Sequence, residues 1–475
     1  MIDASMKAAP RRTLIRGADV LTMERGEPDL PSTDVLVEAG RIAAIGHNLK
    51  VDDAEVVDAA GKILMPGMVD GHRHVWEAID VAGLVPTYYA DYSRYHEWKM
   101  RIMPAMAPED CYHAEYVGCL SAIDSGVTTL VDFAHGLHTP DMAFAGAEGA
   151  IASGIAGIFC WQIAHVLTYG LNQSVPRAQG WADRNALPTE MHYRTAARLR
   201  DEYFGRSDGP MQFGLALSNS SYGHTMAQVV EEFRRARSLE PRLITHHVRS
   251  RRANPLPPEG YFRTISDLRD AGVLGPDYHL THANDWSDDE LTMMADAGSK
   301  LCSAPSVETL YESHLTCVHA RARALGVDVG LGLDQPNTFS NDFFEMLRIG
   351  YWSLWRTVPS RTLAGGYDSN DMLAFVTRDG AKAIGMGDVT GTIAIGKRAD
   401  LVLLSTDRYG LPSWGSLADR IVNFAVQQDV DSVWIGGVRR KRDGRMIGVD
   451  WRRLKAETDE RQARINSDAA TVIIT

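Results

Sequence analysis

Two histidines separated by a single residue end an apolar run near the start of the chain. His72 and His74 close the segment ILMPGMVDGHRH. In a β-strand, residues two apart point to the same side, so both imidazoles can face one point. Two neutral imidazoles that converge suit a borderline divalent cation such as zinc. The pair alone is a weak signal, because surface and core histidines often share this spacing.

Three later apolar runs also end in residues that bind metals or move protons. RLITHH ends in His246 and His247, YHLTHAN contains His282, and VDVGLGLD ends in Asp334. Side chains of His246 and His247 point to opposite faces of a strand, so only one of them can join the same centre. The set predicts a metal site assembled from several strand ends.

The elements that carry these residues alternate in type over residues 65–385. Stretches such as 226–238 and 287–297 have apolar residues at helical spacing and lie between short apolar runs. Counting the run that ends at His74, there are eight such runs; the other seven are 126–135, 154–162, 211–219, 242–247, 278–284, 299–306 and 327–334. Eight strand–helix units predict an α/β fold, a (β/α)8 TIM barrel whose active site lies at the carboxyl ends of the strands.

The two ends of the chain are rich in short β-type runs. Residues 1–64 and 386–450 are therefore expected to form the two parts of a small β-sandwich. The last segment, 451–475, is expected to be a tail that includes a solvated helix, because it is rich in Arg, Glu and Asp.

Four motifs together resemble the amidohydrolase superfamily, in the branch of cytosine- and guanine-type deaminases and triazine hydrolases. They are PGMVDGHRH, the strand-end histidine of ITHHVRS, THANDWSDDELTMMADAG and VGLGLDQP. The segment GTIAIGKRADLVLL is similar to the family's return into its small β-sandwich. The resemblance spans about residues 14–448. It implies a metal-dependent hydrolase that acts on C–N bonds other than peptide bonds.

The resemblance also implies a ligand set. His72, His74, His247 and Asp334 would reach the metal or its bound water, and His282 would contact the metal or the substrate. Aligning ITHHVRS with the family's strand-HxxE ending favours His247, which leaves His246 as a packed imidazole.

A single divalent ion is expected. The binuclear members of the superfamily carry a carboxylated Lys on strand four, and the run MQFGLALSN has none. Zinc fits best, while cobalt, iron and manganese suit the same ligands.

The expected chemistry follows from charge. A zinc-like ion lowers the pKa of water from about 15.7 towards 7, so hydroxide forms at neutral pH. Asp334 can accept the proton of that water as general base. His282 can polarise the carbon under attack.

The chain departs from the deaminases at one position. They have a Glu three residues after the strand-five His, where this chain has Ser250, or Arg249 when counted from His246. Neither side chain can replace a carboxylate as a proton shuttle. Two other carboxylates, Glu77 after strand one and Glu308 after strand seven, are alternatives.

Without that Glu, substrates with good leaving groups are favoured. The sequence therefore predicts hydrolysis of an amide, urea, carbamate or thiocarbamate, in which the chain resembles the phenylurea and thiocarbamate hydrolases. The alternatives are a deaminase or dechlorinase of an aminated or halogenated heterocycle (purine, pyrimidine or triazine) and a metal-dependent lyase or decarboxylase.

Loops at the carboxyl ends of the strands would bind the small-molecule substrate. The segment after strand one is rich in aromatic residues, which either wall in an apolar substrate or pack a long loop or a subunit interface. The candidate substrate-binding residues are Trp76, Glu77, Tyr92, His135, Trp161, Asn219, Arg249 and Ser250.

Composition limits the partners. The chain has 61 acidic and 49 basic residues and a net charge of −12, which argues against nucleic acids and anionic membranes. No apolar stretch approaches the roughly 20 residues that span a bilayer. The five cysteines show no CxxC spacing, so reduced thiols and a cytoplasmic location are expected. A homo-oligomer is expected because barrels of this kind commonly form closed homo-oligomers.

Overall fold

The computed structural model describes residues 12–84, 93–164, 166–205, 209–218, 223–247, 264–311, 317–356 and 366–475. The candidate substrate-binding residues Tyr92, Asn219, Arg249 and Ser250 lie outside these ranges. Their roles in substrate binding therefore stay predictions.

A parallel sheet of eight strands forms the centre of the described part of the chain. Each of the eight apolar runs in the sequence contributes one strand, so the predicted barrel is confirmed. The strands are β6 (Met68–Arg73), β7 (Val127–Ala134), β8 (Ala156–Gln162), β10 (Met211–Ala216), β11 (Ile244–His247), β12 (Tyr278–Thr281), β13 (Lys300–Ser303) and β14 (Asp328–Leu331).

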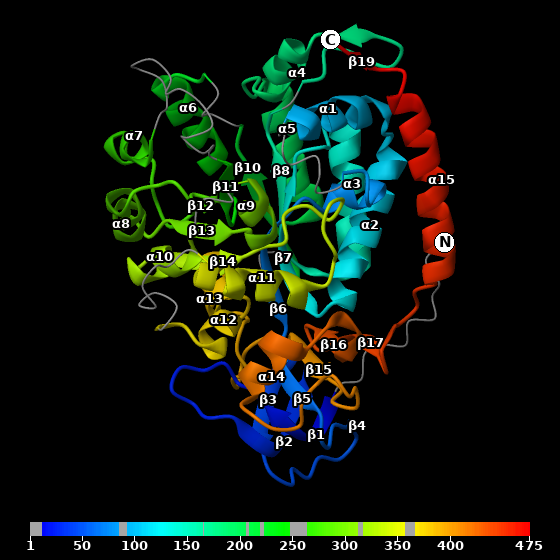
Figure 1. Ribbon diagram of the computed structural model, residues 1–475, viewed down its shortest axis with the longest axis vertical. Coiled ribbons are helices and arrows are strands. Elements are labelled where there is room, and N and C mark those ends of the chain that lie inside the picture. The colour runs from blue at the N-terminus through cyan, green and yellow to red at the C-terminus, as the bar shows by residue number, and fades with distance from the viewer. Residues whose placement is uncertain are drawn as a thin grey trace.

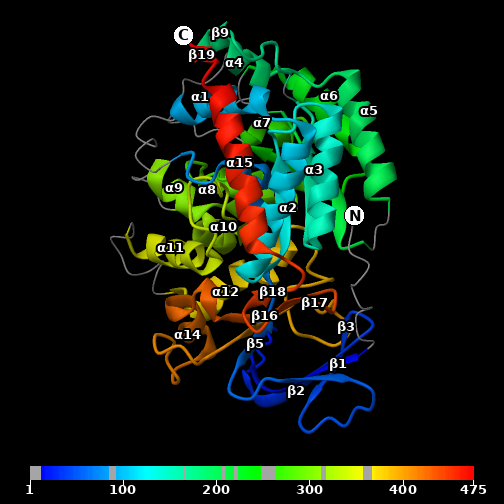
Figure 2. The ribbon, with the colours of Figure 1, turned by 90° about the vertical axis from the view of Figure 1, so that its right-hand side faces the viewer.

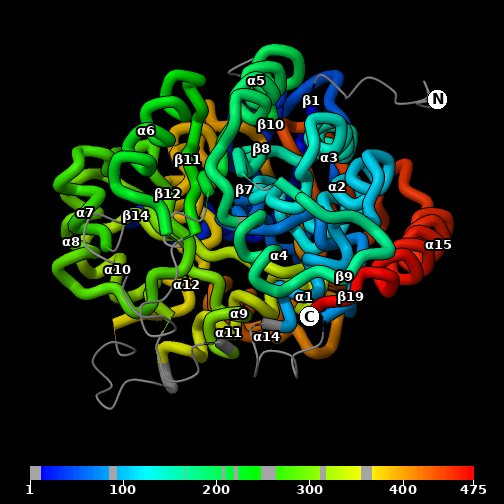
Figure 3. The backbone as a smooth tube through the Cα atoms, turned by 90° about the horizontal axis from the view of Figure 1, so that it is seen from above, coloured from blue at the N-terminus to red at the C-terminus, as the bar shows by residue number. Residues whose placement is uncertain are grey.

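The sheet closes where its last strand returns to its first. Arg73 and Asp334 form a parallel bridge. The amide of Asp334 donates to the carbonyl of His72 at 2.9 Å, and the amide of His74 donates to the carbonyl of Asp334 at 2.8 Å. Viewed from above, the strands surround a common centre (Figure 3). Closure therefore places residues 72–74 directly beside residue 334.

Helices cover the outside of the barrel (Figures 1 and 3). The two helices expected from apolar spacing are present as α6 (Met226–Arg237) and α8 (Asp288–Asp296). The other helices of the barrel are α2 (Pro108–Asp124), α3 (Pro140–Ser153), α5 (Glu190–Arg198), α7 (Ile265–Asp270), α9 (Pro305–Tyr311), α10 (His319–Ala324), α11 (Phe343–Arg356), α12 (Ser369–Phe375) and α13 (Arg378–Ala383). Further helical elements are η1 (Val75–Asp80), α1 (Ser93–Ile102), η3 (Met103–Ala105), α4 (Arg177–Arg184) and the π-helical turn η4 (Leu199–Tyr203).

The two chain ends build a second sheet below the barrel (Figure 1). Within the described residues it has nine strands, and β5 from the first part pairs antiparallel with β15 from the second. Its strands are β1 (Arg12–Val20), β2 (Leu30–Glu38), β3 (Arg41–Gly46), β4 (Glu55–Asp58), β5 (Ile63–Pro66), β15 (Leu401–Leu404), β16 (Val430–Ile435), β17 (Val438–Arg442) and β18 (Arg445–Met446). The chain passes from this sheet to the barrel between β5 and β6. Helix α14 (Leu417–Phe424) and the turn η8 (Gln427–Asp429) lie between β15 and β16.

The C-terminal helix is less solvated than its composition indicated. Helix α15 (Trp451–Ala469) runs alongside α2 and α1 (Figure 2). Its residues Leu454, Ile465 and Ala469 are buried, and Arg461 and Arg464 bind the carboxylate of Asp110. After it, β19 (Ile473–Ile474) pairs with β9 (Ser174–Val175). The expectation of a solvated helix is therefore wrong for one of its faces.

Two simpler expectations concern the thiols and the apolar segments. All five cysteines are buried and free. None of the helices in the described ranges combines the length and apolarity needed to cross a membrane.

Candidate metal centre

The junction of β6 and β14 fixes three of the candidate ligands through the backbone. The hydrogen bonds that close the barrel hold Asp334 between His72 and His74. Close approach there requires Gly332, since a Cβ at this position would lie 2.6 Å from the carbonyl oxygen of His72. Asp334 itself has a φ of 71°, in the left-handed region that few non-glycine residues adopt outside functional sites.

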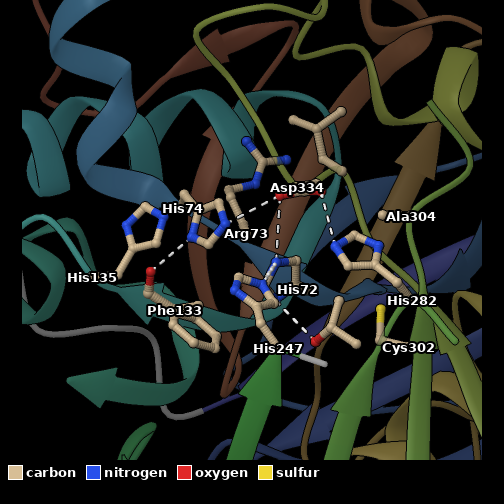
Figure 4. A network of polar contacts seen from close by, with 12 residues as sticks. His72, Arg73, His74, Phe133, His135, His247, His282, Cys302, Ala304 and Asp334 are labelled. Carbon is tan, nitrogen blue, oxygen red and sulfur yellow. Dashed lines mark hydrogen bonds and ion pairs between the residues drawn. The ribbon is translucent and has the colours of Figure 1, made fainter. Parts of the chain in front are cut away.

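Four side chains converge on one point at the carboxyl ends of the strands (Figure 4). Nε2 of His72 lies 3.1 Å from Nε2 of His247 and 3.4 Å from Oδ1 of Asp334. Nε2 of His74 lies 3.2 Å from the same Oδ1. Tetrahedral ligands at zinc-like bond lengths of about 2.0–2.1 Å stand about 3.3 Å apart. The donor spacing therefore fits one small divalent ion.

The protonation states of these groups fit the same ion. Burial lowers the pKa of His72 to about 4, although its contacts with Asp334 act in the opposite direction. Burial also lowers the pKa of His74 and takes that of His247 well below its usual value. Burial alone would raise the pKa of Asp334, but its contacts with His72 and His74 hold it well below the usual range. Three neutral imidazoles and one carboxylate are a donor set that suits zinc.

Neighbouring groups orient the imidazoles. Nδ1 of His74 donates to the carbonyl oxygen of Phe133 at 2.9 Å, which leaves Nε2 as an acceptor facing the centre. The ring of His247 stacks on Phe133 at 4.1 Å, and that of His135 stacks on His74 at 3.9 Å. His135, a candidate substrate-binding residue, thus contacts a candidate ligand directly.

The structure separates the two adjacent histidines of β11. His247 faces the centre, whereas Nδ1 of His246 lies 3.0 Å from the hydroxyl of Tyr278 on the opposite side. Because His246 is fully buried in that position, it is a packed imidazole, as the alignment with the family implied.

His282 lies beside the centre in a more open position. Its Nε2 is 3.6 Å from Oδ2 of Asp334, and 26% of its side chain is exposed. Its backbone has a φ of 77°, which turns the residue away from the path of β12. This imidazole can therefore contact both the centre and a bound substrate.

Glu308 lies directly behind His282. Its Oε1 is 3.0 Å from Nδ1 of His282 and accepts from the amide of Ala304 at 2.7 Å, while Oε2 accepts from the hydroxyl of Ser303 at 2.6 Å. Burial would raise its pKa, but the hydrogen bonds from His282, Ala304 and Ser303 lower it below the usual value. The sequence named Glu308 as an alternative carboxylate, but not its contact with His282.

Glu77 lies on the other side, behind His74. The hydroxyl of Tyr95 donates to its Oε1 at 2.7 Å and lies 3.1 Å from Nε2 of His135. Trp76 donates from its indole nitrogen to Nδ1 of His135 at 2.8 Å. Since Trp76 is fully buried, its side chain supports His135 from inside the protein.

Trp161 is fully buried as well. Its indole nitrogen donates to the carbonyl oxygen of Leu137 at 2.6 Å, and its ring stacks on His192. The substrate-binding role predicted for Trp161 stays a prediction. Its contacts in the structure are those of a packed side chain.

Comparison with known proteins agrees with this geometry. Residues 262–440 match the model of the amidohydrolase family. Over these residues the chain is similar to the amidohydrolase family that its motifs resemble. It is an enzyme, a hydrolase whose relatives act on C–N bonds.

Two relatives illustrate the range of that family. The 5'-deoxyadenosine deaminase of Methanosarcina acetivorans is 26% identical over 466 residues, which cover 96% of this chain and 99% of the relative. The hydroxydechloroatrazine ethylaminohydrolase of a Pseudomonas species is 26% identical over 416 residues, covering 83% and 80%.

A solved structure shows the same fold. An adenosine deaminase from Xanthomonas campestris with bound zinc superposes with a TM-score of 0.79 at 19% identity, over 97% of this chain and 100% of that one.

Proposed function

We propose that this enzyme is a metal-dependent deaminase that replaces an amino group on an aromatic nitrogen heterocycle, of the purine or triazine type, with an oxygen from water. The observation that carries the proposal is the convergence of His72, His74, His247 and Asp334 beside the open imidazole of His282. Such a centre combines a metal site with a residue that can contact the substrate.

The relatives support ring amines as the substrate class. The 5'-deoxyadenosine deaminase and the hydroxydechloroatrazine ethylaminohydrolase match most of the chain, and both are named for removing an amino group. The sequence prediction put amides, ureas and carbamates first and ring deamination second. The relatives favour the second of these.

His72, His74, His247 and Asp334 would hold the ion. A zinc-like ion bound there would lower the pKa of water from about 15.7 towards 7 and so supply a nucleophile at neutral pH. Asp334 is ionised, so it would accept the proton of the attacking water. His282, whose side chain is 26% exposed beside Asp334, would hydrogen-bond the nitrogen that leaves.

Hydrolysis of an acyl substrate with a good leaving group is the second candidate. Ser250 stands where the deaminases have a carboxylate, and this favours leaving groups that need little protonation. Both candidates use the same centre but differ in the product released.

The test uses metal-loaded enzyme in water enriched in oxygen-18 with a panel of aminated purines and triazines. We expect ammonia or alkylamine release with one labelled oxygen on the ring carbon. Product without solvent oxygen would indicate a lyase. If none of the aminated purines and triazines is converted, ring deamination is contradicted.

A further inference from the structure

We propose that Glu308 is a positioning residue, whose carboxylate holds His282 so that His282 Nε2 delivers a proton to the departing amine. The pair would do the work of the carboxylate that the deaminases carry three residues after their strand-five His, where this chain has Ser250. This inference rests on the proposed function.

The contacts of Glu308 confine its action to His282. Its side chain is 3% exposed, and its two oxygens accept from Ala304, Ser303 and His282. A carboxylate held by these donors is fixed in place and does not reach a substrate itself. Its effect on the reaction must therefore pass through the imidazole it holds.

The same contact fixes the direction in which His282 faces. Because Nδ1–H donates to Glu308, Nε2 lies on the opposite edge of the ring, 3.6 Å from Oδ2 of Asp334. Nε2 is thus placed between the proposed general base and the open side of the centre. The dashed contact from His282 to Asp334 in Figure 4 marks this edge of the ring.

The backbone around His282 depends on such contacts. His282 and Ala283 have φ values of 77° and 80°, both left-handed. Conformations of this kind persist only where the surroundings over-determine them. Two hydrogen bonds supply that restraint: the one from Nδ1 to Glu308, and the one that the backbone amide of His282 donates to the carbonyl oxygen of Cys302 at 2.9 Å.

Glu77, the other carboxylate near the centre, has a different partner. It accepts from the phenol of Tyr95, behind His74. That bond leads through Tyr95 to His135, which stacks on His74, whereas the bond of Glu308 leads directly to the partly exposed imidazole beside Asp334. Of the two carboxylates, Glu308 is therefore the one that can position His282.

The proposed reaction exchanges the amino group of the ring for the oxygen of water. That oxygen bonds to the ring carbon, and the carbon–nitrogen bond breaks. The proton removed from water passes from Asp334 to Nε2 of His282 and from there to the leaving nitrogen, which departs as ammonia. No oxidant or further reactant is required.

The experiment compares Glu308→Ala and Glu308→Gln with Glu232→Gln in the metal-loaded enzyme. Glu232 is the matched control, since it also accepts from a strand-end amide and a serine hydroxyl, both of Ser218 (2.7 and 2.6 Å). Each variant is assayed on a 6-aminopurine ribonucleoside and on its 6-chloro analogue, because chloride leaves without a proton.

We expect Glu308→Ala to lower kcat on the amino substrate about 100-fold, with KM changed less than about threefold and a much smaller loss on the chloro analogue. Glu308→Gln should keep part of the activity, because its amide oxygen can still accept from Nδ1. If Glu308→Ala does not fold, the Gln variant carries the comparison. Glu232→Gln should keep its rates on both substrates.

Equal losses on both leaving groups, or a wild-type rate in the variants, would overturn the role of Glu308. If the wild type attacks only acyl substrates, the proposed function fails, and the same comparison between anilide and phenoxide leaving groups still tests Glu308. A crystal structure of Glu308→Ala provides a readout without turnover. The ring of His282 should turn away from Asp334, and an unchanged ring would contradict the positioning role.

Discussion

Two buried carboxylates hold strand ends in this barrel, and only one of them lies at the proposed centre. Glu232 of α6 accepts from the amide and the hydroxyl of Ser218, after β10. Glu308 of α9 accepts from the amide of Ala304 and the hydroxyl of Ser303, after β13. Their bonds to the strand ends are nearly the same.

The difference between them is one imidazole. Burial raises the pKa of Glu232 to about 7, and its bonds to Ser218 only partly oppose this. Burial acts on Glu308 in the same way, yet the hydrogen bond from His282 helps to lower its pKa below the usual value. The hydrogen bond from one imidazole, that of His282, thus accounts for the difference: the pKa of Glu232 is raised, whereas Glu308 is ionised beside the centre. The predictions below test how far this difference extends.

The largest effect is expected from removing the ion itself. Dialysis against a chelator should abolish turnover, and one equivalent of zinc or cobalt per chain should restore it. The midpoint of thermal unfolding should fall on removal, because a ligand that binds only the folded state stabilises it. Full activity in protein shown by elemental analysis to contain no metal would contradict the centre.

Asp334→Asn should cost nearly as much. We expect kcat/KM to fall about 10⁴-fold, because the variant loses both a charged donor and the general base. Circular dichroism should show an intact fold. Activity within tenfold of the wild type would show that Asp334 is not part of the reacting centre.

Gly332→Ala should have a smaller effect through geometry. The added Cβ would lie 2.6 Å from the carbonyl oxygen of His72, so β14 must move away from β6. A displacement of about 1 Å at the ligands is expected to cost about 100-fold in kcat. Gly366→Ala is the control, because a Cβ there meets no atom of the described residues within 4 Å. Equal rates in the two variants would contradict the proposed role of this close approach.

Glu232→Gln should change stability and leave kcat within about threefold. The pKa of about 7 in the folded protein lies above the ordinary value of 4.5, so the stability linked to this group is present below pH 4.5 and lost as the pH rises through 7. At pH 8 the ionised, buried group costs the wild type roughly 3 kcal/mol. Denaturant titrations from pH 4.5 to 8 should show a flatter profile for the variant. Parallel profiles would contradict the raised pKa.

The sequence predicted the barrel well, because strands and helices of this fold carry regular apolar patterns. All eight strands lie in the runs named from the sequence, and His247 rather than His246 faces the centre. These features depend on local periodicity and on a resemblance in motifs, both of which a sequence displays.

Contacts between distant side chains were harder to predict. The bond between His282 and Glu308 depends on how α9 follows β13, and no spacing in the chain signals it. Trp76 follows β6 and Trp161 is the last residue but one of β8, as pocket residues would be, yet both side chains are fully buried. The apolar face of α15 is carried by few residues, including Leu454 and Ile465, in a helix dominated by charges.

The most direct test of the account measures kcat/KM of the zinc-loaded enzyme on two panels side by side. One panel contains aminated purines and triazines assayed for ammonia or alkylamine, and the other contains aryl amides, ureas and carbamates assayed for aniline or phenol. The account predicts turnover of the ring amines at a kcat/KM at least about 100-fold higher than for any acyl substrate. Turnover of the acyl panel alone would contradict ring deamination and return the function to the class that the missing strand-five carboxylate first indicated.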